Sequence, residues 1–312
     1  MAMPRPIIID TDPGQDDAVA ILLALASPEL EVKAITTVAG NVPLPLTTEN
    51  ALRVVELANR TEVAVYAGCP RPMLRPLLTA EHVHGKSGLD GSDLPPAKIA
   101  ARAQHAVAFL IEALAQAPEP ITLVPIGPLT NIALALVARP AIQANIREIV
   151  LMGGAWKTGG NTSPAAEFNI LVDPHAADVV FRAGIPIVMM PLDVTHQNLT
   201  TPERLERIRA IGTKLAQTVA NMLAFYDRHD IEKYGMPGGP LHDPTTIAYL
   251  LKPDLFGGKK VHVAIETADT PAQGTTIVDW WGKTKAEPNA LFVNAIDSDG
   301  FYRLLLQRLA RL

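Results

Sequence analysis

The stretch Ile7-Ile8-Ile9-Asp10-Thr11-Asp12-Pro13-Gly14-Gln15-Asp16-Asp17 decides the fold of this chain. Its three β-branched apolar residues predict a buried strand, and Pro13-Gly14 predicts a sharp turn. The apolar run from Ala18 to Ala26 then predicts a helix. This strand–turn–helix unit is the first of several along the chain.

Four aspartates lie within this stretch, where the strand gives way to the helix: Asp10, Asp12, Asp16 and Asp17. Carboxylates this close repel one another and raise each other's pKa, unless a cation or a helix N-terminus absorbs the charge. Any single member, Asp16 for example, could be an ordinary helix N-cap with solvated neighbours. Four together beside a buried strand favour a site for a hard metal ion.

Short apolar strands alternate with longer helical patterns through the first ~190 residues, which is typical of a parallel sheet with crossover helices. The expected strands are Pro6–Asp10, Val32–Val38, Val63–Ala67, Ile121–Pro125, Ile149–Met152 and Ile187–Met190. The expected helices are Asp16–Ala26, Thr47–Ala58, Gln104–Gln116, Leu129–Val137 and Pro174–Phe181.

The last third of the chain has a different pattern. We expect helices at Pro202–Arg209, Lys214–Tyr226, Pro244–Leu251 and Ser298–Leu309, and strands at Val261–Glu266 and Thr275–Trp280. No repeat, low-complexity tract or linker interrupts the chain. The sequence therefore predicts an α/β fold in one domain, residues 1–312. Its core would be an open, mostly parallel, Rossmann-like sheet flanked by helices, with an additional helical C-terminal portion folded back onto it.

Composition narrows the class of protein. Apolar residues make up 48% of the 312 residues and charged residues 19%, which suits a large buried core. No apolar run approaches the ~18 residues that span a bilayer, and no signal-peptide pattern precedes the first strand, so we expect no membrane partner. The single cysteine, Cys69, fits a reducing cytoplasm. A net charge of −5 without a basic stripe argues against a nucleic-acid partner and favours a small, neutral substrate.

Small or polar residues follow each expected core strand. They are Asp10-Thr11-Asp12, Ala39-Gly40-Asn41, Ile126-Gly127-Pro128, Gly153-Gly154 and Leu192-Asp193-Val194-Thr195-His196. In open parallel sheets ligands bind at the carboxyl ends of the strands, where the strand order reverses. Loops after strands are often polar for no functional reason, which accounts for Gly127 and Gly153 but poorly for the aspartates.

Three further clusters carry groups of chemical interest. Glu167-Phe168-Asn169, after Gly159-Gly160-Asn161, places a carboxylate and two amides in one loop, suited either to neutral hydroxyls or to ordinary loop capping. Asp243 in His242-Asp243-Pro244 could be a plain N-cap of the helix that follows. His84 lies in a glycine-rich segment, where a surface histidine would also be unremarkable.

Asp10-Thr11-Asp12-Pro13-Gly14-Gln15-Asp16-Asp17 resembles the signature of the inosine–uridine nucleoside hydrolases, Asp-x-Asp-Pro-Gly-x-Asp-Asp. The resemblance runs along almost the whole chain. In the family's order it also takes in Val38-Ala39-Gly40-Asn41, His84-Gly85-x-x-Gly88-Leu89-Asp90-Gly91, Gly127-Pro128-Leu129-Thr130-Asn131, Met152-Gly153-Gly154, Ala166-Glu167-Phe168-Asn169 and His242-Asp243-Pro244.

The resemblance implies a set of site residues. One Ca²⁺ would be held by the carboxylates of Asp12, Asp17 and Asp243 and by the backbone carbonyl of Ile126, since a hard cation requires oxygen ligands. Ribose would be bound by Asp16, Asn41, Met152, Asn161, Glu167 and Asn169. His242 matches the histidine that protonates the leaving base, and His84 and Tyr234 match side chains that close over the base or nucleoside.

These groups suit hydrolysis of an N-glycosidic bond, in which positive charge develops on the ribose and negative charge on the base. Our hypothesis is that Asp12 accepts the proton of the attacking water, with Asp16 as the second choice. The helix that includes His229 and should face the base is highly charged, and the overall likeness leans toward the pyrimidine-preferring or broad-specificity branch. The resemblance also implies a role in nucleoside salvage and a homotetramer or dimer.

Two other functions remain open from the sequence. A haloacid-dehalogenase-type phosphatase also begins with a strand and Asp-x-Asp, but its pattern continues differently and needs a phosphate-binding lysine that we do not find. The other alternative is a Ca²⁺-dependent nucleoside- or ribose-binding protein with little or no turnover.

Overall fold

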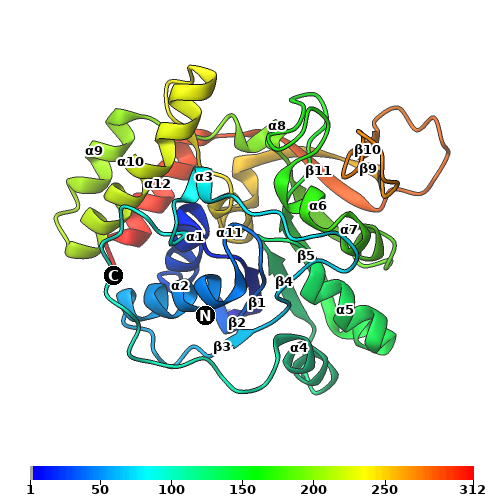
Figure 1. The fold of residues 1–312 in the computed structure, drawn as a ribbon, viewed down its shortest axis with the longest axis horizontal. Helices are drawn as coiled ribbons and strands as arrows, with labels where there is room; N and C mark the ends of the chain where they lie inside the picture. Colours follow the sequence, from blue (N-terminus) through cyan, green and yellow to red (C-terminus); the bar gives the residue numbers. More distant parts are fainter. Residues whose placement is uncertain (1–2) are drawn as a thin grey trace.

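The computed structural model describes residues 3–312, apart from the side chains of Asp230 and Tyr234. Nine strands form one sheet in the order β10-β9-β11-β6-β5-β4-β1-β2-β3 (Figure 1). Neighbours from β3 to β11 run parallel, whereas the pairs β11–β9 and β9–β10 are antiparallel. The predicted open, mostly parallel sheet is therefore confirmed.

The strands of this sheet are β1 (Arg5–Thr11), β2 (Leu30–Thr37), β3 (Val65–Ala67), β4 (Ile121–Pro125), β5 (Ile146–Met152), β6 (Ile187–Met190), β9 (Phe256–Ile265), β10 (Thr276–Asp279) and β11 (Ala290–Ile296). A separate two-stranded pair is formed by β7 (Leu199–Thr200) and β8 (Gly239–Pro240). The helices are α1 (Gln15–Leu25), α2 (Leu44–Leu57), α3 (Glu81–His84), α4 (Ala106–Ala115), α5 (Thr130–Ala138), α6 (Phe168–Val172), α7 (Pro174–Phe181), α8 (Leu192–Thr195), α9 (Pro202–Arg209), α10 (Lys214–Tyr234), α11 (Pro244–Leu251) and α12 (Ser298–Leu309). Short 3₁₀ segments are η1 (Pro140–Asn145) and η2 (Pro253–Leu255).

Most expected elements are present, and several have the predicted bounds. Three differences matter for the site. Helix α1 begins at Gln15 with Gly14 as its N-cap, so the N-cap interpretation of Asp16 is wrong. Helix α10 continues to Tyr234, eight residues beyond the predicted end, and the unpredicted strand β11 joins β9 to the parallel core.

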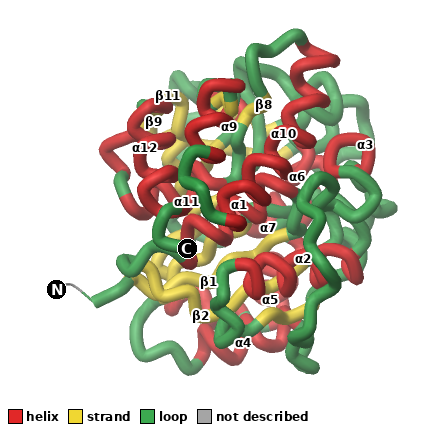
Figure 2. Tube along the Cα trace, turned by 90° about the vertical axis from the view of Figure 1, so that its left-hand side faces the viewer, coloured by secondary structure: helices red, strands yellow, loops and turns green. Residues whose placement is uncertain are grey.

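Helices cover both faces of the sheet (Figure 2). Because side chains alternate along a strand, Ile7 and Ile9 of β1 face one layer and Ile8 the other. The first layer contains α1, α2, α10, α11 and α12, and the second contains α4, α5 and α7. These two apolar layers hold the sheet between them and fix where the strands end.

Helix α1 is buried along its whole length, on every side. It is apolar from Ala18 to Leu25, as a helix enclosed by other elements must be. Its first turn nevertheless carries Asp16 and Asp17, which are 5% and 1% exposed. The fold therefore fixes two carboxylates in its interior.

The strand order reverses beside β1. The chain runs from β1 outward to β2 and β3, then returns to place β4 on the other side of β1. The crevice expected at such a reversal lies at the carboxyl ends of β1 and β4, where Asp12 and Ile126 follow. Among the described residues, no helix has both the length and the apolar character needed to cross a membrane.

Candidate active site

A cavity of about 310 Å³ opens at this edge of the sheet. Its lining includes ten of the predicted site residues: Asp16, Asn41, His84, Ile126, Met152, Asn161, Glu167, Asn169, His242 and Asp243. They come from segments spread over more than 200 residues of sequence. None of the described residues that line the cavity is a lysine or an arginine. The fold thus gathers the predicted residues around one acidic pocket.

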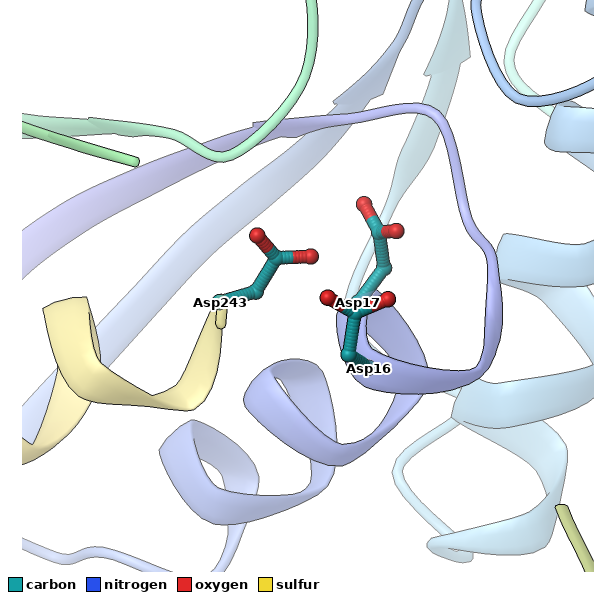
Figure 3. Close-up of side chains that lie close together, drawn as sticks. All are labelled: Asp16, Asp17 and Asp243. Carbon is teal, nitrogen blue, oxygen red and sulfur yellow. The ribbon is translucent and has the colours of Figure 1, made fainter. Parts of the chain in front are cut away.

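Three carboxylates meet at one end of the pocket, which we call its floor: Asp16 and Asp243 line the cavity, and Asp17 lies next to them (Figure 3). Asp16 and Asp17 come from the first turn of α1, and Asp243 precedes α11. Each offers an oxygen that lies within 4.8 Å of those of the other two. Asp243 occupies the N-cap position of α11, but its side chain makes no capping bond and points toward the other two. The plain N-cap interpretation therefore does not explain Asp243.

The predicted ligands Asp12 and Asp17 lie just behind this pocket and are fully or almost fully buried. Asp17 accepts hydrogen bonds from the Thr11 hydroxyl at 2.5 Å and from the backbone N–H of Gly14 at 2.9 Å. Oδ2 of Asp12 accepts the backbone N–H of Asn41 at 2.7 Å. Oδ1 of Asp12 has no hydrogen-bond partner among the described residues. A buried carboxylate oxygen without a partner needs a cation or a donor to offset its desolvation.

Burial raises the pKa of each carboxyl in this group. The pKa of Asp16 rises to about 8, first through burial and then through the charge of Asp17. Burial and the surrounding carboxylates raise the pKa values of Asp12 and Asp243 well above the usual range. These four carboxyl groups destabilise one another's charged form, and no lysine or arginine among the described lining residues offsets the charge. Such a group of oxygen donors matches the ligands of a hard divalent cation.

The fourth predicted ligand, the carbonyl oxygen of Ile126, faces the same pocket. It accepts a hydrogen bond from Nδ2 of Asn169 at 3.1 Å, and the same amide lies 3.3 Å from the carbonyl oxygen of Met152. Asn169 thereby fixes two backbone carbonyls predicted to contact metal and ribose. Whether each predicted ligand binds a cation stays a prediction.

Glu167 lies at the start of α6 rather than in an irregular loop. Its carboxylate accepts backbone N–H groups of Asn169 and Gly154, both at 2.9 Å, and of Ile170 at 3.3 Å. The capping interpretation of this segment is therefore correct, and the same carboxylate also lines the pocket. Burial raises the pKa of Glu167 to about 7, although these hydrogen bonds partly oppose the shift.

Asn41 and Asn161 are the other two amides among the residues predicted to bind ribose. Nδ2 of Asn41 donates to the backbone oxygen of Asp12 and to Oδ2 of Asp17, both at 3.2 Å. Oδ1 of Asn161 accepts the backbone N–H of Phe168 at 3.0 Å. Both amides therefore have fixed orientations beside the acidic floor.

His242 is buried at the side of the pocket, 8% exposed. Its Nδ1 lies 2.7 Å from the hydroxyl of Thr195, and its ring centroid lies 5.7 Å from that of His196. Burial lowers the pKa of His242 well below its usual value, with His196 as a smaller cause. The ring is thus a neutral group at neutral pH, adjacent to Asp243.

His84, at the end of α3, lines the pocket and is 6% exposed. Its ring stacks on Tyr226 of α10 at a centroid distance of 5.3 Å. The surface interpretation of His84 is therefore wrong. The remaining predicted residue, Tyr234, has a side chain that lies outside the described residues.

Several lining residues were not predicted as site residues. They include Tyr226, His82, His196, His229, Phe168 and Met236. His82 and His229 pack edge to face at 5.4 Å, so α3 meets α10 over the pocket. His196 belongs to the strand-end segment Leu192–His196, which the sequence pattern had placed in the crevice, and His229 lies on the helix that was expected to face the base. Both positions therefore carried a usable signal.

Comparisons with known proteins identify the family of this chain. A family model for the inosine-uridine preferring nucleoside hydrolases matches residues 7–303. The pyrimidine-specific ribonucleoside hydrolase RihA of Escherichia coli (strain K12) is 49% identical over 308 residues, covering 98% of this chain and 99% of that protein. The RihA protein of Shewanella woodyi is 50% identical and covers 98% of both chains.

Solved structures give the same result. A purine-preferring ribonucleoside hydrolase from Gardnerella vaginalis superposes with a TM-score of 0.91 at 33% identity, covering 98% of each chain. The match in fold, the match along the whole sequence and the acidic pocket all agree, and the chain belongs to the inosine–uridine preferring nucleoside hydrolase family.

Proposed function

We propose that this ribonucleoside hydrolase cleaves the N-glycosidic bond of its substrates in a Ca²⁺-dependent reaction that gives free base and ribose. The observation that carries the proposal is the meeting of Asp16, Asp17 and Asp243 beside the unpartnered Oδ1 of Asp12, in a pocket that His242 also lines. The carboxylates would form a site for the cation, and His242 would supply a hydrogen-bond donor to the leaving base.

We assign Asp12, Asp17, Asp243 and the Ile126 carbonyl to the cation. When bound, Ca²⁺ would attract the hydroxyl oxygens of ribose and lower the pKa of a water molecule beside it. Asp16, the third carboxylate on the floor, is assigned to the ribose 2′-hydroxyl.

Asp12 is our first choice for the group that accepts the proton of the attacking water. Within the described part of the chain its Oδ1 has no hydrogen-bond partner, whereas Oδ2 accepts the backbone N–H of Asn41. A general base must be free to accept a proton at a fixed position, and this arrangement leaves one oxygen free for it. Asp16 is the second choice.

The ribose would be held by groups whose orientations the fold has already fixed, namely Asn41, Asn161, Glu167, Asn169 and the Met152 backbone. As the bond breaks, the ribose becomes positively charged, and the surrounding carboxylates stabilise that charge more than they stabilise the substrate.

His242 would donate a proton or a hydrogen bond to the departing base. A neutral imidazole can do so only through a ring N–H, and Nδ1 already faces Thr195. The Nε2 side of the ring is therefore the one assigned to the substrate.

The identity to pyrimidine-specific RihA proteins supports a preference for uridine and cytidine in nucleoside salvage. We further propose a cytoplasmic enzyme that acts as one domain and assembles as a homotetramer or dimer. The lone cysteine supports the first point, and the span of the family match, residues 7–303, supports the second.

Reducing-sugar release from uridine, cytidine, inosine and adenosine tests the proposal, with added Ca²⁺ and after chelation. We expect ribose release that chelation abolishes and Ca²⁺ restores, fastest with the pyrimidine nucleosides. Tight nucleoside binding without ribose release would instead support the binding-protein alternative. Release of inorganic phosphate from phosphorylated substrates would support the phosphatase.

A further inference from the structure

We propose that Gln15 is a positioning residue that holds His84 with its proton on Nδ1, so that Nε2 presents a hydrogen-bond acceptor to the substrate. The inference rests on the proposed function for its substrate, but the state of the His84 ring can be measured without turnover. No part of the proposed reaction has used Gln15.

The orientation of the Gln15 amide follows from its neighbours. One end of the amide lies 3.0 Å from the carbonyl oxygen of His84 and 3.1 Å from that of Asp90. Carbonyl oxygens can only accept hydrogen bonds, so this end must be the NH₂ group. Both of its hydrogens are then used, and the other end is the oxygen.

That oxygen, Oε1 of Gln15, lies 2.8 Å from Nδ1 of His84. An amide oxygen has no proton to give, so the bond forms only if Nδ1 of His84 carries the hydrogen. Gln15 is 0% exposed, and water cannot substitute for the bond. The hydrogen-bonding partners of Gln15 therefore require the His84 tautomer that carries its proton on Nδ1.

The neutral form of His84 is the relevant one. Burial lowers the pKa of His84 to about 3, with the nearby His82 and His229 as smaller causes. A neutral imidazole with its proton on Nδ1 has a lone pair on Nε2. His84 lines the cavity, and no hydrogen bond of Nε2 is found among the described residues. Nε2 is thus an acceptor available to a ligand.

Close packing against its neighbours also holds the His84 ring in place. A methyl group on Gly14 would overlap Nδ1 of His84, so the absence of a side chain at Gly14 lets the ring lie against the start of α1. On its other side the ring stacks on Tyr226. His84 therefore has little freedom to turn and present a different nitrogen.

This arrangement assigns a chemical role to His84. It can accept a hydrogen bond from a substrate O–H or N–H, such as the 5′-hydroxyl or the N3–H of uracil, and it cannot protonate the leaving base. His84 and His242 would then have different roles, with His84 as the hydrogen-bond acceptor and His242 as the donor.

Asn50 of α2 is a matched control for Gln15. Nδ2 of Asn50 donates to the carbonyl oxygens of Pro13 and Ser87, at 3.0 and 2.8 Å. Like Gln15, Asn50 is a buried amide that ties the segment after α3 to the start of α1. Unlike Gln15, Asn50 makes no hydrogen bond to the His84 ring among the described residues. Substitution of Asn50 loosens the segment without removing the partner of Nδ1.

The first experiment is a long-range ¹H–¹⁵N spectrum of the histidine rings at pH 7, with His84 assigned by its absence in His84→Gln. We expect the neutral Nδ1–H pattern in the wild type and in Asn50→Leu, and a mixture of tautomers in Gln15→Met. An Nε2–H or doubly protonated pattern in the wild type would overturn the proposal. So would an equal change in Asn50→Leu and Gln15→Met, since the segment and not the Gln15 oxygen would then be the cause.

The second experiment tests the acceptor role with uridine, 5′-deoxyuridine and 3-methyluridine. His84→Leu should lower kcat/KM for uridine by roughly tenfold, the effect of one neutral hydrogen bond, and His84→Gln should recover part of it. With the analogue that lacks the recognised donor, wild type and His84→Leu should become equal. If neither analogue narrows the difference, His84 is not an acceptor for either group and the assignment fails. Absence of ribose release from the wild type would refute the proposed function, and the ring spectrum would still decide the tautomer.

Discussion

The hydroxyl of Thr195 lies 2.7 Å from Nδ1 of His242, and both side chains are buried. If Nδ1 carried the ring proton, the Thr195 hydroxyl hydrogen would have no acceptor among the described residues. If Thr195 donates to Nδ1, both groups are satisfied and the ring proton lies on Nε2, toward the substrate. Thr195 is thus the counterpart of Gln15, with the opposite effect on its histidine.

Thr195→Val should lower kcat for uridine on the order of tenfold, because it removes the hydroxyl while keeping the shape of the side chain. Thr195→Ser keeps the donor and should retain most of the activity. Steady-state kinetics of the two variants provide the measurement. Equal losses in both would mean that packing at Thr195 matters and its hydroxyl does not.

His242→Ala should reduce inosine cleavage by roughly 10²–10⁴-fold, the usual contribution of a positioned acid. A riboside with an activated leaving group, such as a nitrophenyl riboside, needs no proton at the departing atom and should lose much less. The ratio of kcat/KM for the two substrates is the quantity to compare. The same loss on both would remove His242 from the acid role.

Asp12→Asn should lower ribose release by roughly 10²–10⁴-fold, as expected for loss of a general base. Asp12 is also a predicted Ca²⁺ ligand, so the metal content of the variant must be measured by atomic emission alongside turnover. Near-normal turnover with Ca²⁺ bound would contradict the assignment, and Asp16→Asn is the comparison that tests the second choice.

Gly127→Ala should weaken Ca²⁺ binding without altering any charged group. A methyl group at Gly127 would overlap Oδ1 of Asp12, so the carboxylate would have to move, at a cost of roughly 1–3 kcal/mol. Gly257→Ala on β9 is the control, because its nearest neighbour would be 3.4 Å away. Calcium titration of both variants should show a loss only in Gly127→Ala, and unchanged affinity there would place the metal away from Asp12.

Glu167 should make the protein less stable as the pH rises. Its pKa is raised from 4.5 to about 7 in the folded protein, so the folded state retains a proton that the unfolded chain releases. The contribution is fully present below pH 4.5 and lost as the pH rises through about 7, by about 3 kcal/mol at most. The free energy of unfolding of Glu167→Gln should therefore approach that of the wild type between these pH values.

Urea unfolding of the wild type and Glu167→Gln at several pH values between 4.5 and 7.5 gives this difference directly. Other buried carboxyls contribute equally to both proteins and cancel in the comparison. A difference that stays constant with pH would show that Glu167 is ionised throughout the range.

The sequence predicted the parallel core well because its strands are short apolar runs between strong turn signals. Strands β4 and β6 and helix α7 were placed at their observed bounds. Strand β11 was missed because its continuous apolar run, Ala290–Val293, is only four residues long, and its place is set by pairing with β6 and β9. Pairing with distant segments is not visible in a local pattern.

The structure brings ten of the predicted site residues to the lining of one pocket, and their roles stay predictions. The groups that orient these residues were not predicted. Gln15 and Thr195 have side chains that are common on helices, and nothing in their local sequence marks the nitrogen that each faces. Their roles follow only from distances between segments 47 and 69 residues apart.

Helix α1 is enclosed on every side, so the site residues that it carries tolerate substitution less well than site residues near the surface. A substitution at Asp16 or Asp17 is also a change in the middle of the hydrophobic core, so the reaction chemistry is tied to whether the chain folds at all. We call α3 and α10 the rim of the pocket. Exposed and half-buried side chains on the rim can be exchanged at small cost to the free energy of unfolding. Directed evolution of new base specificity should therefore collect its substitutions on the rim and leave the floor of the pocket intact.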